Sequence, residues 1–279
     1  MTAIVFALAA SGVWGVADFF AGVKSRSHGV LTVLVVGQLA GLSIASVLAA
    51  AAWNAPPQRA LFAIPAAVTG TLGLFAFLKA MAVGAISLVT PLVSLSAAVP
   101  VVFGVATGDD LSWAQAAGIA LAVGGAFFAA VESVAEEGGR RSLGAGVGLA
   151  IVAALAFGSY FPFMDAAADD DLFWAVLVFR LTSSSIVVTA LLGSGTRLTA
   201  RTAVTVTPLV LIGVGDVAGI AFFGAASQSG LVSVVSVLSS LYPVIGVLLA
   251  AFLLRERLTG IQWAGVAAVF VGVALISAG

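Results

Sequence analysis

The order of apolar and polar residues divides the chain into ten apolar stretches separated by short polar turns. Most are about twenty residues long, the length that an α-helix needs to cross the roughly 30 Å hydrocarbon core of a bilayer. The pattern predicts an all-α polytopic membrane protein with ten transmembrane helices. Their expected bounds are Ala3–Val23, Val30–Ala52, Phe62–Met81, Ile86–Ala106, Ser112–Val131, Ala145–Met164, Leu172–Leu192, Val204–Gly224, Leu231–Leu253 and Gly260–Ser277.

Two of the predicted turns contain almost no charge: Val83–Ala85, between the third and fourth stretches, and Gln228–Gly230, between the eighth and ninth. A continuous helix over Phe62–Ala106 would be about 67 Å long at 1.5 Å per residue, more than twice the hydrocarbon thickness. A tight turn is therefore the better interpretation at each place.

The composition agrees with a chain that lies almost entirely in the membrane. Of 279 residues, 62% are hydrophobic and 8% are charged, whereas about 25% of an average soluble chain is charged. Ten spans leave no length for an extramembrane catalytic domain. The formal net charge of −1 provides no basic excess, so we expect no nucleic-acid partner. The absence of cysteine excludes disulfides, thiolate metal sites and a cysteine nucleophile.

Lysine and arginine are concentrated in alternate loops, which predicts the orientation of the chain. These residues resist translocation and stay on the cytoplasmic side of a membrane. One side carries only Arg59, together with the acidic runs Asp109–Asp110 and Asp165–Asp171. We therefore expect both termini outside the cytoplasm, and a retained first helix because no basic residue precedes it. The other side carries Lys24, Arg26, Arg140, Arg141, Arg197, Arg201, Arg255 and Arg257.

The second half of the chain repeats the first at an offset of 146 residues. The matched residues are Gly84, Ser87, Val89, Leu92 and Ser94 with Gly230, Ser233, Val235, Leu238 and Ser240. One residue of slippage later, Leu-Ser-x-x-Gln-x-x-Gly at 111–118 returns as Leu-Thr-x-x-Gln-x-x-Gly at 258–265. We expect two five-helix repeats, 1–139 and 140–279, in one domain. Because five is odd, the second repeat enters the membrane from the opposite face, which gives an inverted repeat.

These features resemble the drug/metabolite transporter superfamily, specifically its EamA-type exporters. Each half closes with the Leu-Ser/Thr-x-x-Gln-x-x-Gly motif, and the second half carries the family's full loop at Glu256–Thr259. Trp14-Gly15 matches the family's tryptophan–glycine pattern, and Arg180 stands where the family has an arginine in its second helix.

The first half departs from the family's loop with Asp109–Ser112, the second copy has Phe157-Gly158, and Gln38 replaces the arginine in the first half. The resemblance covers essentially the whole chain. It implies a secondary transporter of small metabolites, such as an amino acid or a drug-like compound, that exports its cargo by alternating access from the cell inner (plasma) membrane.

Asp18 and Lys79 are two of the few charged residues expected inside the spans. A charged side chain at the bilayer centre costs roughly 2.5 to 3.5 kcal/mol on insertion scales, so it normally faces a cavity or a partner. With the termini outside, both residues lie a few positions short of the cytoplasmic interface. They are candidates for an ion pair that closes the cavity on that side; the alternative is that each side chain reaches separately for the interface.

Arg180 and Asp216 are the other charged pair. The helical rise places both near the middle of their spans, where an inverted-repeat carrier holds its substrate. Arg180 could then bind a substrate carboxylate, while Asp216, and also Asp18, could take up a coupling proton or bind an amino group. The alternative is a static pair that only specifies helix packing.

Uncharged polar and aromatic residues complete the predicted binding site. Hydroxyl groups at 87, 90 and 94, and again at 233, 236 and 240, share one helix face, where they either line the cavity or bridge helices. Aromatic side chains could stack on a lipophilic cargo or simply pack between helices. Pro100 and Pro243 are expected to bend their spans. The predicted substrate contacts are Trp14, Gln38, Ser94, Tyr160, Arg180, Asp216, Phe223, Ser240 and Tyr242.

Motifs for chemistry are missing from the sequence. There is no Gly-Lys-Ser/Thr phosphate loop, no metal-ligand spacing and no Gly-x-Ser-x-Gly elbow, so we expect neither an enzyme nor a cofactor. The expected partners are a small-molecule substrate and the lipid bilayer, with the monomer as the functional unit. A passive channel and an intramembrane lipid-modifying enzyme are the alternatives, and the repeat argues against the enzyme because catalysis gives no reason to duplicate and invert a helical unit.

Overall fold

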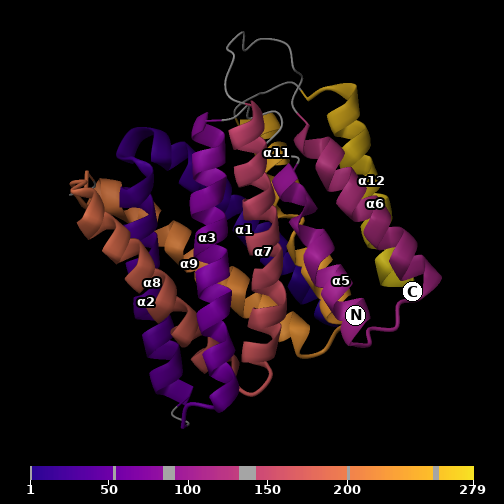
Figure 1. The fold of residues 1–279 in the computed structure, drawn as a ribbon, viewed down its shortest axis with the longest axis horizontal. Helices are drawn as coiled ribbons and strands as arrows, with labels where there is room; N and C mark the ends of the chain where they lie inside the picture. Colours follow the sequence, from indigo (N-terminus) through magenta and orange to yellow (C-terminus); the bar gives the residue numbers. More distant parts are fainter. Residues whose placement is uncertain (1, 53–54, 84–91, 132–142, 200–201, 254–257) are drawn as a thin grey trace.

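The computed structural model describes residues 2–52, 55–83, 92–131, 143–199, 202–253 and 258–279, and these form a bundle of helices (Figure 1). Within the described residues, nine helical segments are long and apolar enough to cross a membrane, and Leu92–Thr107 is a shorter apolar helix. The protein is thus an all-α, multi-pass membrane protein, as the hydrophobic pattern predicts. The predicted boundary between the repeats, and the residues Ser87, Thr90, Arg255 and Arg257, lie outside the described residues.

The described helices agree with the predicted spans to within a few residues, and α2 has the predicted bounds. The 3₁₀ segments are η1 (Gln58–Phe62) and η2 (Leu95–Ala97). The α-helices are α1 (Thr2–His28), α2 (Val30–Ala52), α3 (Ala63–Val83), α5 (Ala98–Thr107), α6 (Trp113–Ala130), α7 (Leu143–Ala168), α8 (Leu172–Ser194), α9 (Ala203–Ser227), α10 (Val232–Ser239), α11 (Tyr242–Leu253) and α12 (Gly260–Ala278).

The fourth and ninth spans are interrupted rather than merely bent. The ninth span breaks at Ser240 and Leu241 between α10 and α11. Pro243 follows directly, and because proline has no backbone N–H it cannot continue the hydrogen-bond ladder. The fourth span contains η2 at the corresponding place, a few residues before Pro100. The interruptions lie at matching places in the two repeats.

The shared Leu-Ser/Thr-x-x-Gln motif starts a helix in both halves. Ser112 accepts a hydrogen bond from the N–H of Gln115, and the Gln115 side chain accepts one from the N–H of Ser112. Thr259 and Gln262 form the same capping box at the start of α12. The repeat therefore preserves a local signal that satisfies backbone donors at the first turn of each closing helix.

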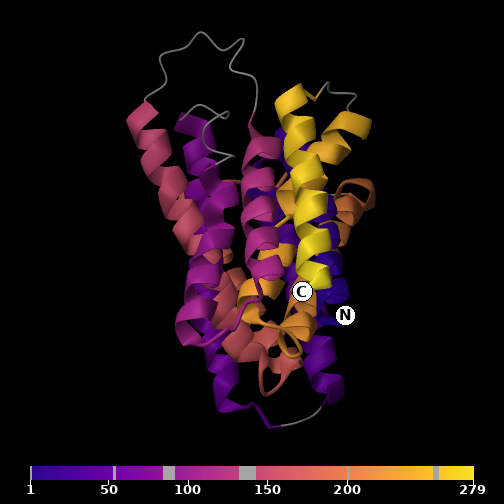
Figure 2. The ribbon, with the colours of Figure 1, turned by 90° about the vertical axis from the view of Figure 1, so that its right-hand side faces the viewer.

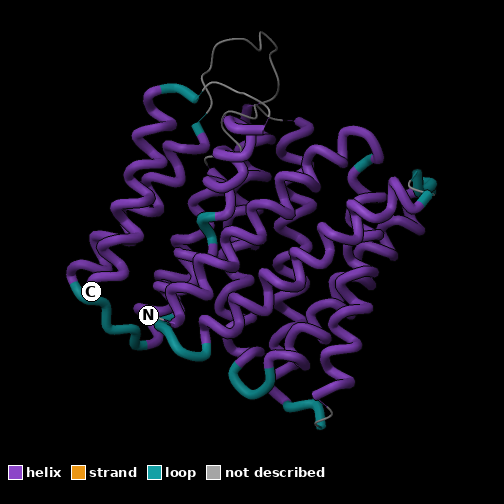
Figure 3. Tube along the Cα trace, turned by 180° about the vertical axis from the view of Figure 1, so that it is seen from behind, coloured by secondary structure: helices purple, strands orange, loops and turns teal. Residues whose placement is uncertain are grey.

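The helices of the two halves run in opposite directions. The start of α1, the α2–α3 connection and the α7–α8 turn lie at one end of the bundle, so α1 starts where α7 finishes (Figures 1 and 2). The termini lie on the same side of the molecule, as the view from behind also shows (Figure 3). We call this the acidic end, because it carries Asp109, Asp110 and Asp169–Asp171 besides Arg59. The opposite end carries Lys24 and Arg197 and is called the basic end.

The helix pairs are also reciprocal between the halves. Helix α1 packs on α9 and α11, and its counterpart α7 packs on α3 and α5; α2 packs on α9 and α8 on α3. At the acidic end Arg59 pairs with Asp169, and at the basic end Thr199 Oγ1 donates to the carbonyl of His28 at 2.7 Å. These reciprocal contacts are what a pseudo-two-fold axis between the halves requires.

The α6–α12 pair shows this reciprocity at atomic detail. A Cβ atom on Gly118 would lie 2.7 Å from the carbonyl oxygen of Gly272, and one on Gly125 would lie 2.7 Å from that of Gly265. Gly118 and Gly125 are the repeat partners of Gly265 and Gly272, so each contact is the image of the other. Glycine at these four positions lets the two backbones approach closely, as small residues do between membrane helices.

Candidate functional site

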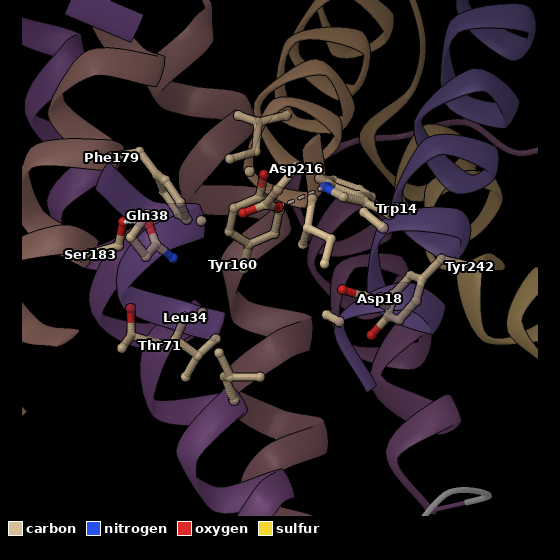
Figure 4. Close-up of a pocket in the computed structure, with 18 of the residues that line it drawn as sticks. Trp14, Asp18, Leu34, Gln38, Thr71, Tyr160, Phe179, Ser183, Asp216 and Tyr242 are labelled. Carbon is tan, nitrogen blue, oxygen red and sulfur yellow. Dashed lines mark hydrogen bonds between the residues drawn. The ribbon is translucent and has the colours of Figure 1, made fainter. Parts of the chain in front are cut away.

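A cavity of about 230 Å³ lies among the six long helices α1, α2, α3, α7, α8 and α9 (Figure 4). Only Tyr242 reaches it from the broken ninth span. The polar side chains that line it are Trp14, Asp18, Gln38, Thr71, Tyr160, Ser183, Asp216 and Tyr242. Five of the nine predicted substrate contacts, and the predicted proton site Asp18, therefore lie together in one cavity.

Asp216 lies at the centre of this polar group. Its Oδ1 accepts a hydrogen bond from the indole Nε1 of Trp14 at 3.2 Å, drawn as the dashed line in Figure 4. Its Oδ2 lies 2.7 Å from Nη2 of Arg180, in an ion pair whose N–H does not point straight at the oxygen. The Asp216 side chain is 38% exposed, so one face of the carboxylate remains open to the cavity. The predicted meeting of Arg180 and Asp216 is present in the structure.

Arg180 itself lies behind the cavity wall. Its side chain is 0% exposed, and Nη1 donates to Oε1 of Gln38 at 2.9 Å. Gly41 makes room for it, because a Cβ there would lie 3.2 Å from the guanidinium carbon. The guanidinium is covered in this conformation, with Nη1 bonded to Gln38 and Nη2 beside Asp216, and a contact between Arg180 and the cargo stays a prediction.

Gln38 links the two halves at this level. Its Oε1 accepts from Arg180 and also from Ser183 Oγ at 2.9 Å, and its carbonyl accepts from Ser184 Oγ at 3.3 Å. Gln38 in α2 and Arg180 in α8 occupy matching positions in the two repeats. Their hydrogen bond therefore joins equivalent points of the two halves. Ser183 is a cavity residue that sequence reasoning missed.

Asp18 and Lys79 are not brought together. Asp18 is exposed into the cavity, and Figure 4 shows it beside Tyr242. Lys79 is also exposed, but it is not among the residues that line the cavity. In the described part of the chain, no ion pair joins the two side chains. The proposed gate between them stays a prediction for another conformation.

Three of the four aromatic residues that were predicted to contact the cargo line the cavity. The rings of Trp14, Tyr160 and Tyr242 line the cavity, with Trp14 6.1 Å from Tyr160 and 6.5 Å from Tyr242 in edge-to-face geometry. Phe223 is 0% exposed and packs 5.2 Å from the ring of Phe161, behind the wall. Its predicted contact with the cargo is corrected to a packing role.

Ser94 and Ser240 do not line the cavity. Both are buried, and Ser240 Oγ donates to the carbonyl of Val237 at 2.9 Å, within its own span. Here the interpretation of the hydroxyl stripe as structural, which the sequence left open, fits better than cavity lining. The interruption after Ser239 turns this face toward neighbouring helices instead of the hollow.

Some residues that line the cavity were not predicted from the sequence, and helix geometry explains two of them. Phe179 and Ser183 line the cavity while Arg180 does not. Neighbouring residues on a helix differ by about 100°, so 179 and 183 share one face and 180 belongs to the next. Thr71, in α3, was overlooked because Thr69 and Thr71, two residues apart, do not share one helix face and so form no polar stripe among the apolar residues.

Comparisons with known proteins bear on this arrangement. The model of the EamA-like transporter family matches residues 144–278. A solved crystal structure aligns with a TM-score of 0.82 over 98% of this chain and 95% of that chain, with 16% identical residues, and so shares the fold. A search of curated proteins found no match. Among the described residues, no three His, Asp or Glu side chains are grouped so that they could hold a metal.

Proposed function

This chain belongs to the EamA-like transporter family of the drug/metabolite transporter superfamily, and from that premise we propose that it exports a small organic metabolite by alternating access. It is a multi-pass membrane transporter and not an enzyme. The substrate, the direction and the mechanism are the proposal. The cavity supports it, since it extends between the repeats from the helix midpoints, where carriers of this architecture bind cargo, toward the basic end.

The observation that carries the mechanism is an asymmetry between matched positions. Ala21 in α1 lines the cavity, whereas Met164, its counterpart in α7, is 0% exposed. Leu34 in α2 lines the cavity, whereas Val176, its counterpart in α8, is 2% exposed. The hollow is thus displaced from the middle of the bundle toward the basic end.

If the first repeat adopted the packing that the second has in this structure, and the second adopted that of the first, the protein would reach the opposite conformation. Met164 and Val176 would then line a hollow displaced toward the acidic end, while Ala21 and Leu34 would become packed. Because the helix pairs are reciprocal, α7 can adopt the contacts of α1 without a new kind of packing. This exchange is the transport cycle that we propose.

Contacts at the acidic end favour a carrier over a passive channel. Asp109, in the α5–α6 connection, accepts hydrogen bonds from the backbone N–H of Ser233 at 2.9 Å and from its hydroxyl. Arg59 pairs with Asp169 and lies 3.8 Å from Asp170. A continuous pore would need a water path through this end, and these contacts join the halves across it.

The remaining parts of the proposal rest on the family and the site. We place the protein in the inner (plasma) membrane with the basic end toward the cytoplasm, because positive residues are retained there. We propose the monomer as the functional unit. Proton coupling through Asp18 or Asp216 stays a prediction.

Counterflow in proteoliposomes tests the carrier mechanism. Vesicles are preloaded with a high concentration of L-serine, L-phenylalanine or 2-phenylethylamine, and a trace of the same compound in radiolabelled form is added outside. A carrier accumulates at least one label transiently above equilibrium, and the flux saturates. Entry without overshoot or saturation would identify a channel, and chemically altered label would identify an enzyme.

A further inference from the structure

We propose that the cargo is a small organic cation, a protonated amine or a quaternary ammonium with an apolar or aromatic body. This inference rests on the proposed transport function and names the substrate class of the same cavity. Its starting point is the charge that the cavity presents. Among the described residues that line it, the charged ones are Asp18 and Asp216, both acidic.

The nearby positive charge does not reach the cargo. Arg180 is the cation next to the cavity, its side chain is 0% exposed, and it is paired with Asp216 and bonded to Gln38. One positive charge therefore faces two carboxylates, and Asp18 is left with no cationic partner in the described part of the chain. A carboxylate in a membrane-embedded hollow is stabilised by an incoming cation.

The walls of the cavity suit a cation with an apolar body. Tyr242 lies beside Asp18, Trp14 lies next to Asp216, and Tyr160 and Phe179 also line the cavity (Figure 4). A cation within about 6 Å of an aromatic ring centre is attracted by the electrons of the ring face. Tyr160 adds a buried hydroxyl that has no hydrogen-bond partner among the described residues.

A second hollow, at the acidic end, carries the same sign of charge. It is lined by Asp109, Asp165 and Asp169, with Arg59 as its basic residue. Hollows lined by one sign of charge raise the local concentration of the opposite ion. A cation that leaves or enters at this end therefore passes a favourable region, whereas an organic anion is repelled there and again at Asp18.

The same geometry disfavours a carboxylate-bearing cargo. A carboxylate would meet Asp18 and the open face of Asp216 before any positive group. To reach Arg180 it would have to displace Asp216 from an ion pair of 2.7 Å and enter a fully buried site. An amino acid could use its ammonium group at Asp18, but its carboxylate would remain without a partner.

Ligand-induced thermal stabilisation of the purified protein tests the inference without measuring transport, because a ligand that binds the folded state raises the unfolding temperature. The probes are benzyltrimethylammonium and 2-phenylethylamine as cations, L-phenylalanine as zwitterion and 3-phenylpropionate as anion. We expect both cations to bind and the anion not to bind. Asp18→Asn should weaken cation binding at least tenfold, whereas Asp110→Asn, at the exposed acidic end, should leave it unchanged.

Protection from carbodiimide provides a second reading on the unmutated protein, in case Asp18→Asn fails to fold. Benzyltrimethylammonium should slow modification of Asp18, measured by mass spectrometry of the peptide, and 3-phenylpropionate should not. Tighter binding of L-phenylalanine or the anion than of the cations, or no cation binding and no protection, would overturn the inference. Counterflow of L-phenylalanine alone would also overturn it while leaving the carrier mechanism intact.

Discussion

The two repeats use the same positions for different purposes in this conformation. In the first repeat the inner faces of α1 and α2 border the cavity as far as Ala21 and Leu34, whereas in the second Met164 and Val176 are buried at the matching places. The residues of these faces differ, since Ala17, Asp18 and Ala21 of α1 correspond to Tyr160, Phe161 and Met164 of α7. The proposed transport cycle requires that a change of conformation can still reverse which repeat borders the cavity.

The repeats also differ in chemistry where they meet. Gln38 of the first repeat contacts Arg180 at the matching position of the second, and the second repeat adds Asp216. The helix pairs are reciprocal, but the binding chemistry is not. In the proposal above, the carboxylates, and not the symmetric framework, determine what the cavity accepts.

Replacing Asp216 should lower the stability of the protein most, because the second repeat then loses the carboxylate that distinguishes its binding chemistry from that of the first. Asp216→Ala leaves Arg180 buried without its counter-ion, and losing one member of a buried pair costs about 3–5 kcal/mol. Arg180→Met should cost less, because water can reach the 38% exposed side chain of Asp216. Thermal unfolding in detergent measures both, with Asp110→Ala as the control. A larger loss for Arg180→Met would show that the carboxylate is the more deeply buried partner.

Replacing the matched glycines Gly15 and Gly158 by alanine should lower the stability by an intermediate amount. The pair tests whether equivalent helix contacts in the two repeats are equally tight. A Cβ on Gly15 would lie 2.8 Å from the carbonyl oxygen of Tyr242, and one on Gly158 would lie 2.5 Å from that of Ser96. Each alanine variant should lose about 1–3 kcal/mol of stability through overpacking.

Gly12→Ala and Gly148→Ala are matched controls in the same two helices, because nothing lies within 4 Å of a Cβ at either position. Both should be neutral or gain about 0.5–1 kcal/mol from the better helix propensity of alanine. If only one of Gly15→Ala and Gly158→Ala were destabilising, the two contacts would not be equivalent.

Removing the Asp109 contact at the acidic end should lower the stability least. It should also shift the equilibrium toward the conformation in which the second repeat borders the cavity. Asp109→Ala removes the side chain that accepts from Ser233 at the start of α10, worth about 1 kcal/mol for a capping interaction. That energy corresponds to roughly a fivefold change in an equilibrium. Maleimide labelling of Met164→Cys should therefore become about fivefold faster in the Asp109→Ala background. No change in rate would mean that this contact does not hold the end closed.

Much of the fold could be predicted because membrane insertion leaves a strong trace in sequence. Apolar stretches near bilayer length placed α2 at its observed bounds, and the recurring Gln115 and Gln262 motif revealed the repeat that the reciprocal packing supports. The interruption at Ser240 was not predicted. Pro243 indicates a disturbed ladder, but whether a helix bends or breaks depends on the neighbours that donate to the carbonyls it leaves unbonded.

The site was predictable where a charged, polar or aromatic residue stands out among apolar neighbours, as Asp18, Trp14 and Gln38 do. The pairing of Arg180 with Asp216 followed from their depth. The direction in which Arg180 points did not, because a rotation of about 100° between neighbouring helical residues separates lining from burial. Phe223 and Ser94 are buried away from the cavity, which residue type alone does not reveal.

Reciprocal accessibility of Ala21 and Met164 tests the central claim most directly. The chain contains no cysteine, so Ala21→Cys and Met164→Cys each introduce a single reactive site. A membrane-impermeant maleimide is applied from one side, then the other, of sealed vesicles of known orientation. Alternating access predicts that Ala21→Cys reacts only from the basic-end side and Met164→Cys only from the acidic-end side. Reaction of both from one side, or of Met164→Cys from neither, would contradict it.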